Sequence, residues 1–137
     1  MVSFDSNNFP SIKNLEITNT SFLDNLLNID NTLINNISIQ KCELNDLTIK
    51  NSFANDSSNL IIDECTLGKL NISSCPSLKV FNLTNCNIDE LIIEKMEIND
   101  EYNPVATIFN NKENFNYSNT KINICGINIS FMETYHS

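Results

Sequence analysis

The sequence contains no Arg and no Trp, and it has two Gly and one His in 137 residues. Without Arg there is no guanidinium fork to bind a phosphate or a base edge. The 8 Lys against 17 Asp and Glu give a net charge of −9, which repels nucleic acid. The one His, His136, is the penultimate residue, and chain ends are poor places for a His-based catalytic site. We therefore expect neither direct nucleic-acid binding nor His-dependent catalysis.

Metal and cofactor motifs are absent as well. The five Cys are an odd number without a Cys-x-x-Cys pair, whereas zinc sites usually draw on close Cys pairs or on His. We interpret them as buried free thiols and expect no metal and no cofactor. No apolar run approaches the length of about 20 residues that spans a bilayer. Residues 1–5 also lack the basic and apolar regions of a secretory signal, so we expect a cytoplasmic protein without membrane contact.

What the sequence does contain is an internal repeat. Apolar or small residues recur two apart in sixteen five-residue frames, with polar residues between the pairs; examples are Ile37-x-Ile39, Cys42-x-Leu44 and Leu47-x-Ile49. Residues two apart point to the same side of an extended chain, so this spacing predicts strands. A helix would need apolar residues three and four apart throughout. Helix is therefore not expected as the main content.

Four frames make one coil, and successive coils begin about 21 to 23 residues apart, at Leu15, Ile37, Leu60 and Phe81. Stacking the coils in this register predicts four interior columns, two bulky and two small. The bulky columns are Leu15, Ile37, Leu60, Phe81 and Leu27, Leu47, Leu70, Leu91; the small ones are Thr20, Cys42, Cys65, Cys86 and Thr32, Ser52, Cys75, Met96. The fold class expected is all-β, a parallel β-solenoid of about four coils with terminal caps.

The frames resemble the motif of the pentapeptide-repeat family, which places a small residue and a Leu or Phe two apart in every five. The most similar stretches begin at Cys42, Cys65 and Cys86, and the resemblance covers roughly residues 12–100. The chain departs from the motif in half of the frames, where Leu, Ile or Phe takes the small-residue position. A leucine-rich-repeat-like solenoid is the alternative, because Leu67-x-x-Leu70-x-Ile72-x-x-Cys75 matches its conserved half and the period fits. It would need a helix or loop in the second half of each coil.

The chain is expected to form a single domain, 1–137. Residues 1–11, with Phe4, Phe9 and Pro10, are interpreted as an N-terminal cap and 12–100 as the repeat solenoid. After Asp100 the repeat stops, and 101–137 are interpreted as an irregular last coil or a C-terminal cap. Both ends need covering because a solenoid exposes edge strands and an open core there.

The strongest functional indication is an acid-rich stretch in the last coil. It holds six carboxylates against one lysine, all outside the inward positions of the frames: Asp89, Glu90, Glu94, Glu97, Asp100 and Glu101. We found no catalytic constellation and expect a non-catalytic protein-binding solenoid. Some pentapeptide-repeat proteins mimic DNA toward topoisomerases, so the resemblance implies an acidic inhibitor of a DNA- or RNA-binding enzyme: a topoisomerase, a nuclease or a phage-defence complex.

The alternative function is a structural or assembly subunit that binds through a solenoid edge or through the segment 102–137. A homo-oligomer formed through a solenoid end belongs to the same expectation, because an open edge strand can pair with a second chain. Steep salt dependence would distinguish charge mimicry from edge docking.

Overall fold

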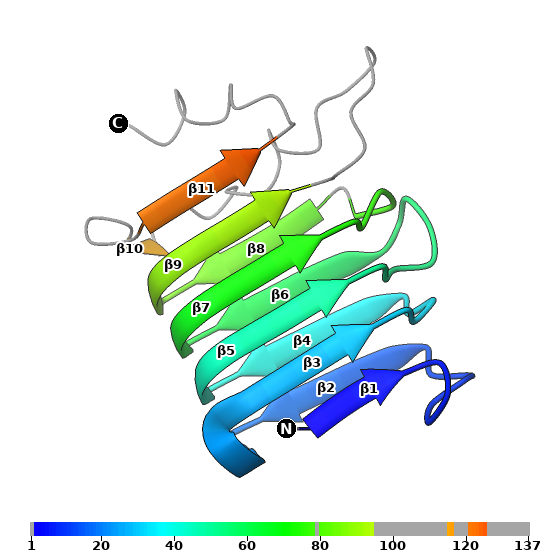
Figure 1. Cartoon of the computed structure of the whole chain (residues 1–137), viewed down its shortest axis with the longest axis horizontal. Coiled ribbons are helices and arrows are strands. Elements are labelled where there is room, and N and C mark those ends of the chain that lie inside the picture. Colours follow the sequence, from blue (N-terminus) through cyan, green and yellow to red (C-terminus); the bar gives the residue numbers. More distant parts are fainter. Residues whose placement is uncertain (1, 79, 95–114, 117–120, 126–137) are drawn as a thin grey trace.

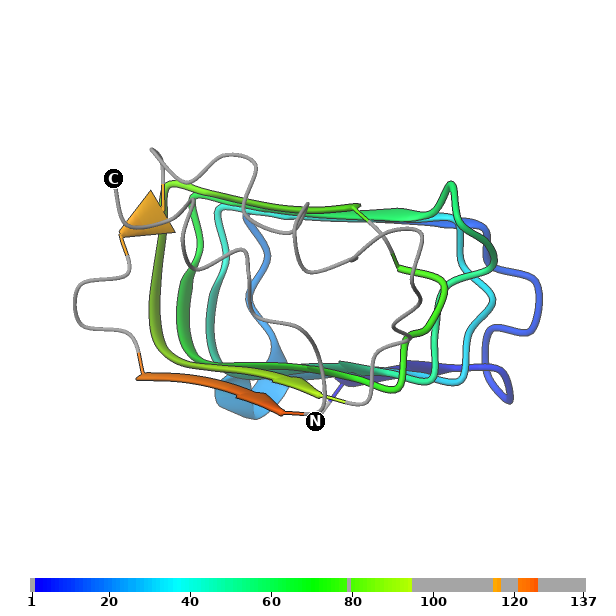
Figure 2. The ribbon, with the colours of Figure 1, turned by 90° about the horizontal axis from the view of Figure 1, so that it is seen from above.

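The computed structural model describes residues 2–78, 80–94, 115–116 and 121–125. Their strands form two sheets, named here sheet A and sheet B, which face each other across the interior (Figures 1 and 2). Sheet A consists of β1 (Val2–Asp5), β3 (Leu26–Asp30), β5 (Glu43–Lys50), β7 (Thr66–Ser73), β9 (Cys86–Glu94), β10 (Phe115–Asn116) and β11 (Lys121–Cys125). Sheet B consists of β2 (Asn14–Thr18), β4 (Asn36–Gln40), β6 (Asn59–Asp63) and β8 (Val80–Thr84).

From β1 to β9 the chain alternates between the two sheets, and every strand pairing in the described residues is parallel. This confirms the predicted parallel β-solenoid of about four coils. The only helix in the described part of the chain is the single 3-10 turn η1 (Leu23–Asn25). The leucine-rich-repeat alternative called for a helix or loop opposite each strand of one sheet, and those positions hold strands of the other sheet instead.

The register of both sheets agrees with the predicted bulky columns. In sheet B, Leu15 pairs with Ile37, Ile37 with Leu60, and Leu60 with Phe81. In sheet A, Leu27, Leu47, Leu70 and Leu91 pair in the same way. The strand pairing of sheet A continues beyond the four predicted coils, because the backbone of Val2 pairs with Leu27 at one end and that of Ile122 with Leu91 at the other.

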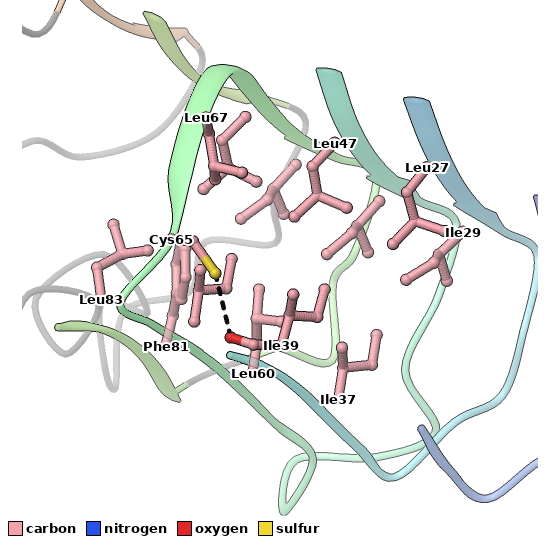
Figure 3. Packing of buried hydrophobic residues seen from close by; sticks show 14 of the residues in the cluster. Leu27, Ile29, Ile37, Ile39, Leu47, Leu60, Cys65, Leu67, Phe81 and Leu83 are labelled. Atoms are coloured by element: carbon pink, nitrogen blue, oxygen red, sulfur yellow. Dashed lines mark hydrogen bonds between the residues drawn. The ribbon is translucent and has the colours of Figure 1, made fainter. Parts of the chain in front are cut away.

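The core lies between the two sheets. Leu, Ile and Phe side chains from both sheets point toward one another there, and those of the inner coils, such as Ile39, Leu47 and Phe81, have no exposed surface (Figure 3). Burying one such side chain contributes about 1.5–3 kcal/mol, so the columns are the main source of stability.

The connections between sheets follow one rule. At seven strand ends the next residue has φ between 49° and 54°; these residues are Asn19, Asn31, Lys41, Asn51, Glu64, Ser74 and Asn85. Such left-handed backbone suits Asn better than most residues, and Asn occupies four of the seven positions. Each of these residues turns the chain out of one sheet, and a small residue follows it.

The small residues after these turns are hydrogen-bond donors. The thiol of Cys42 donates to the carbonyl of Gln40 at 3.2 Å, and the hydroxyl of Ser52 donates to the carbonyl of Lys50 at 2.8 Å. Thr20, Cys65, Cys75 and Cys86 make the same bond to the residue two before them. The small columns therefore satisfy carbonyl groups at the corners besides filling space.

Gly68 lies where β7 bends from the corner into sheet A. A Cβ at this position would approach the backbone oxygen of Asn45, in the preceding coil, to 2.6 Å. Real Cβ atoms do not approach a backbone oxygen that closely, so only glycine lets the two coils stack at this bend.

Three details of the predicted frames are wrong. Thr20 was placed in a small column but is exposed, since no described strand stacks beyond it. The frame Ser52-x-Ala54 was expected to direct both residues inward, but Phe53, with φ of 85°, is buried and Ala54 is only partly buried. Ser58, one of the polar residues between the frames that begin at Ser52 and Leu60, is buried and accepts hydrogen bonds from the backbone N–H groups of Ala54 and Asn55. Met96 lies outside the described residues.

Candidate binding surfaces

The outer face of sheet A carries most of the charge on the strands. Its strands β1 to β9 hold seven carboxylates and two lysines: Asp5, Asp30, Glu43, Asp46, Asp89, Glu90, Glu94, Lys50 and Lys69. One outward column runs Asp46, Lys69 and Glu90 in register, so its charges alternate. The other runs Asp5, Asp30, Lys50, Ser73 and Glu94. The two lysines thus interrupt both negative columns.

The structure places half of the predicted acidic patch. Asp89 is exposed and Glu90 partly exposed at the bent end of β9, and Glu94 is partly exposed at the other end. At about 3.3 Å per residue, Glu90 and Glu94 lie about 13 Å apart along the strand. Glu97, Asp100 and Glu101 lie outside the described residues. The three described carboxylates share one strand and one side of the molecule, but they do not converge on a point.

Sheet B differs strongly on its outer face. Its four strands contain only two charged residues, Glu16 and Asp63, among Asn, Ser, Thr, Gln and Ile. Asp63 is engaged by the next coil, because the Thr84 hydroxyl and the Asn85 amide both donate to it. Asn36 donates to the side-chain oxygen of Asn14 in the preceding coil at 2.9 Å.

A shallow hollow of about 340 Å³ lies on this face. It spans three successive coils and is lined by Asn14, Leu15, Glu16, Asn36, Ile37, Ser38, Asn59 and Ile61. Ser38 is the smallest of the outward side chains in its column, between Glu16 and Ile61, which leaves the space open. This face was not predicted from the sequence, although the low charge of the four strand segments is a sequence signal for it once the register is known.

The two edge strands at the N-terminal end, β1 and β2, differ in whether a side chain covers their free edge. In β1, Asn8 covers one edge of the strand: its Nδ2 donates to the Ser3 carbonyl oxygen at 2.9 Å, and its Oδ1 accepts the Asp5 N–H at 2.9 Å. Groups of residues two apart point to the same edge of a strand, and the opposite edge of β1 pairs with β3. The Asn8 side chain therefore occupies the place where a further strand would bind.

The edge of β2 has no such cover. β2 pairs with β4 through one edge, using the Lys13 carbonyl, which accepts from Asn35 at 2.7 Å, and the N–H of Asn19, which donates to Gln40 at 2.9 Å. Backbone groups alternate in direction along a strand, so those of Asn14, Glu16 and Thr18 point to the other edge. No described strand pairs there. Of these groups, the Thr18 carbonyl accepts a hydrogen bond from the Thr20 hydroxyl at 2.9 Å.

The thiols are held inside the solenoid. Cys42, Cys65, Cys75 and Cys86 are free and buried. Burial raises the pKa of the Cys65 thiol to about 12 and that of Cys75 to about 11, and it also raises the pKa of Cys86. The thiols of Cys65, Cys75 and Cys86 are therefore protonated at neutral pH, and a thiolate is the form that attacks electrophiles and binds metals.

Among the residues that the structure describes, no group of three or more His, Cys, Asp or Glu is arranged to hold a metal ion. The described part of the chain also has no helix that is long and apolar enough to span a membrane. Comparisons of the chain with protein-family models, with curated proteins and with solved structures found no match.

Proposed function

We propose that the protein is a non-catalytic binding module whose sheet A docks on a basic surface of a protein partner. In its sharper form, the partner is a nucleic-acid-processing enzyme, such as a topoisomerase, a nuclease or a phage-defence complex, and the protein inhibits it as an acidic DNA mimic. The observation that carries the proposal is the excess of carboxylates on strands β1 to β9 of sheet A: seven against two lysines.

The scaffold supports this role because it fixes where the charges lie. Parallel rungs repeat at about 4.8 Å, and the buried columns prevent a strand from slipping in register. Carboxylates on such a frame cost little ordering entropy when a partner binds. A fixed negative surface also speeds the encounter with a positive one and orients it.

A cytoplasmic location is part of the proposal. Four unpaired thiols in the core fit a reducing compartment, since secreted proteins of this size more often pair their cysteines in disulfides.

The charge of sheet A can be changed in both directions, by replacing its lysines or its carboxylates. Changing Lys50→Glu and Lys69→Glu together makes both columns of sheet A more negative, and we expect stronger inhibition of the partner. Changing Glu90→Lys and Glu94→Lys together should weaken it. The probes are a purified type II topoisomerase and a purified nuclease, each assayed for DNA relaxation or cleavage over a range of salt concentrations.

The control is Glu16→Lys, which makes the same kind of substitution at one position of sheet B, half the charge change of the Glu90→Lys and Glu94→Lys pair, and should leave inhibition unchanged. Inhibition that falls steeply with salt and moves in opposite directions in the two double variants is the expected result. Two results would contradict the DNA-mimic form of the proposal: equal inhibition by the parent and both double variants, or no inhibition of either enzyme at low salt.

The second candidate is an assembly subunit that binds through a solenoid edge or through the segment 102–137. The uncovered edge of β2 favours the edge form. Removing residues 121–137 would also remove β11, which pairs with β9, so that deletion perturbs sheet A itself. Deleting 126–137 keeps β11 and tests the contribution of the last twelve residues to complex formation by size-exclusion chromatography.

A further inference from the structure

We infer that the free edge of β2 is a docking site for one extended peptide segment of the pattern apolar–Lys or Arg–apolar, supplied by a partner protein. The inference develops the edge form of the second candidate function and is independent of the DNA-mimic proposal. It rests on the backbone of β2, on the slightly less buried side chains at this end of the core, and on Glu16.

The backbone provides the first part of the site. The outward-facing edge groups of β2 belong to Asn14, Glu16 and Thr18, and a five-residue strand can pair with an incoming strand of similar length. Native proteins usually block an edge strand, because it otherwise recruits other chains. In this chain the Asn8 side chain blocks the free edge of β1. No described side chain bonds in the same way across the free edge of β2, at the same end of the solenoid.

The core provides the second part. Side chains at this end are less completely buried than those of the inner coils: Leu15 and Ile17 are 8% and 6% exposed, whereas Ile37 and Ile39, their partners in β4, are 0% exposed. Val2, Phe4, Ile12 and Phe22 pack against the core but are only partly buried. An added strand would extend the columns of Leu15 and Ile17 by one rung. Its two inward residues would therefore be apolar and two apart.

Glu16 determines the residue between them. It lies between Leu15 and Ile17 on the outer face, and it is exposed. In the existing rungs its neighbour is Ser38, so the facing position on a new rung would lie beside the Glu16 carboxylate. Opposite charges on neighbouring strands attract, and like charges repel. A cationic residue is the complement, and the pattern apolar–cation–apolar reads the same in either strand direction.

A second copy of the chain fits less well. Two β2 strands related by a two-fold axis through Glu16 would place the two Glu16 carboxylates directly opposite each other, which is unfavourable. The partner segment is therefore assigned to a different chain.

The test uses a fluorescently labelled seven-residue peptide with the central sequence Ile-Lys-Ile and polar flanks, titrated with the full chain and followed by anisotropy. Two control peptides carry Glu in place of Lys, or N-methyl groups on the edge-facing amides. We expect saturable binding of the first peptide only. Backbone amide signals of residues 14–18 should shift in an NMR titration.

Protein variants separate charge from shape. Glu16→Lys should weaken binding of the Lys peptide by about five- to tenfold and should restore binding of the Glu peptide. Glu43→Lys, an equal change of charge at an exposed residue of β5, should do neither. Thr18→Pro should abolish binding of both peptides, because it removes an edge N–H while keeping Glu16; circular dichroism checks that it folds.

No saturable binding of the Ile-Lys-Ile peptide would overturn the inference, and so would equal binding of the N-methylated peptide or equal effects of Glu16→Lys and Glu43→Lys. The outcome does not depend on the enzyme-inhibition assays, which respond to Lys50, Lys69, Glu90 and Glu94. Either proposal can fail while the other stands.

Discussion

Sheet A and sheet B have the same interior and different exteriors. Both contribute in-register columns of Leu, Ile and Phe to one core, and their inner rungs are buried to the same degree. Outside, the strands β1 to β9 of sheet A carry nine charged residues, whereas the four strands of sheet B carry two. The β1 edge of sheet A is covered by Asn8 and the β2 edge of sheet B is not. The repeat thus specifies the fold from the inside, and the outward positions are free to differ in function.

If the interior is shared, both sheets should be equally sensitive to loss of a core side chain. Leu70→Ala in sheet A and Phe81→Ala in sheet B each remove a side chain with no exposed surface, and we expect losses of about 2–5 kcal/mol in the free energy of unfolding. Leu33→Ala, at a position 72% exposed, should change it by less than about 0.5 kcal/mol. Urea unfolding followed by circular dichroism measures all three. A much smaller loss in one sheet would show that its columns are not equivalent.

The bend of sheet A has no counterpart in sheet B, where the strands are five residues long. Gly68→Ala would bring a methyl group against the Asn45 backbone oxygen, so we expect destabilisation of about 1–3 kcal/mol. Thr66→Ala is the control, since Thr66 is an exposed residue of the same strand. If Gly68→Ala unfolds at the same urea concentration as the parent, the coils have enough slack at the bend to accept a side chain.

The thiols at the corners that join the sheets predict an alkaline limit to stability. The folded-state pKa values of Cys65 and Cys75, about 12 and about 11, exceed the ordinary value of 9.0. Above pH 9 the unfolded chain releases these thiol protons and the folded chain keeps them. Stability is therefore full below pH 9 and falls as the pH rises toward 11 to 12.

Urea midpoints measured between pH 8 and pH 11 test this limit. Cys65→Ser should flatten the fall, because serine does not titrate in this range and Ser52 already occupies an equivalent corner. A slope that Cys65→Ser leaves unchanged would assign the alkaline loss to other groups.

The difference between the two edges can be erased with one substitution. Asn8→Ala exposes the Ser3 carbonyl and the Asp5 N–H of β1, so sheet A gains an open edge like that of sheet B. We expect self-association to increase with concentration in sedimentation velocity, with a stability loss of only about 1 kcal/mol. Asn7→Ala, beside it in the same turn, is the control. Identical sedimentation of parent and variant would mean that the Asn8 bonds do not protect the edge.

The core and the register followed directly from the sequence, because a residue period of five ties each inward side chain to a strand position. The predicted columns of Leu15 and of Leu27 are the observed ones. The turn geometry could not be read in this way. Phe53 is buried through a positive φ that no apolar spacing reports, and Ser58 enters the core because it accepts backbone hydrogen bonds.

The outward direction of the acidic residues could be predicted from the sequence. The charge pattern of the surface could not, because it also depends on which residues of the neighbouring coils lie beside them. Lys69 and Lys50 come from other coils and interrupt the negative columns only once the coils are stacked. The Asn8 bonds were beyond prediction, because they depend on how the chain turns back after β1. The abundance of Asn in the sequence was a signal for the corners that we did not use, because it partly reflects the left-handed turns after the strands.

The repeated corner also makes the molecule extensible. Each coil leaves and re-enters the two sheets through the same kind of turn, so duplicating a segment of 21 to 23 residues would add one complete rung without disturbing its neighbours. Every added rung would lengthen both faces by about 4.8 Å. Gene duplication or deletion of such segments would therefore change the length of the outer faces in fixed steps. The residues at the two ends of the solenoid would stay the same.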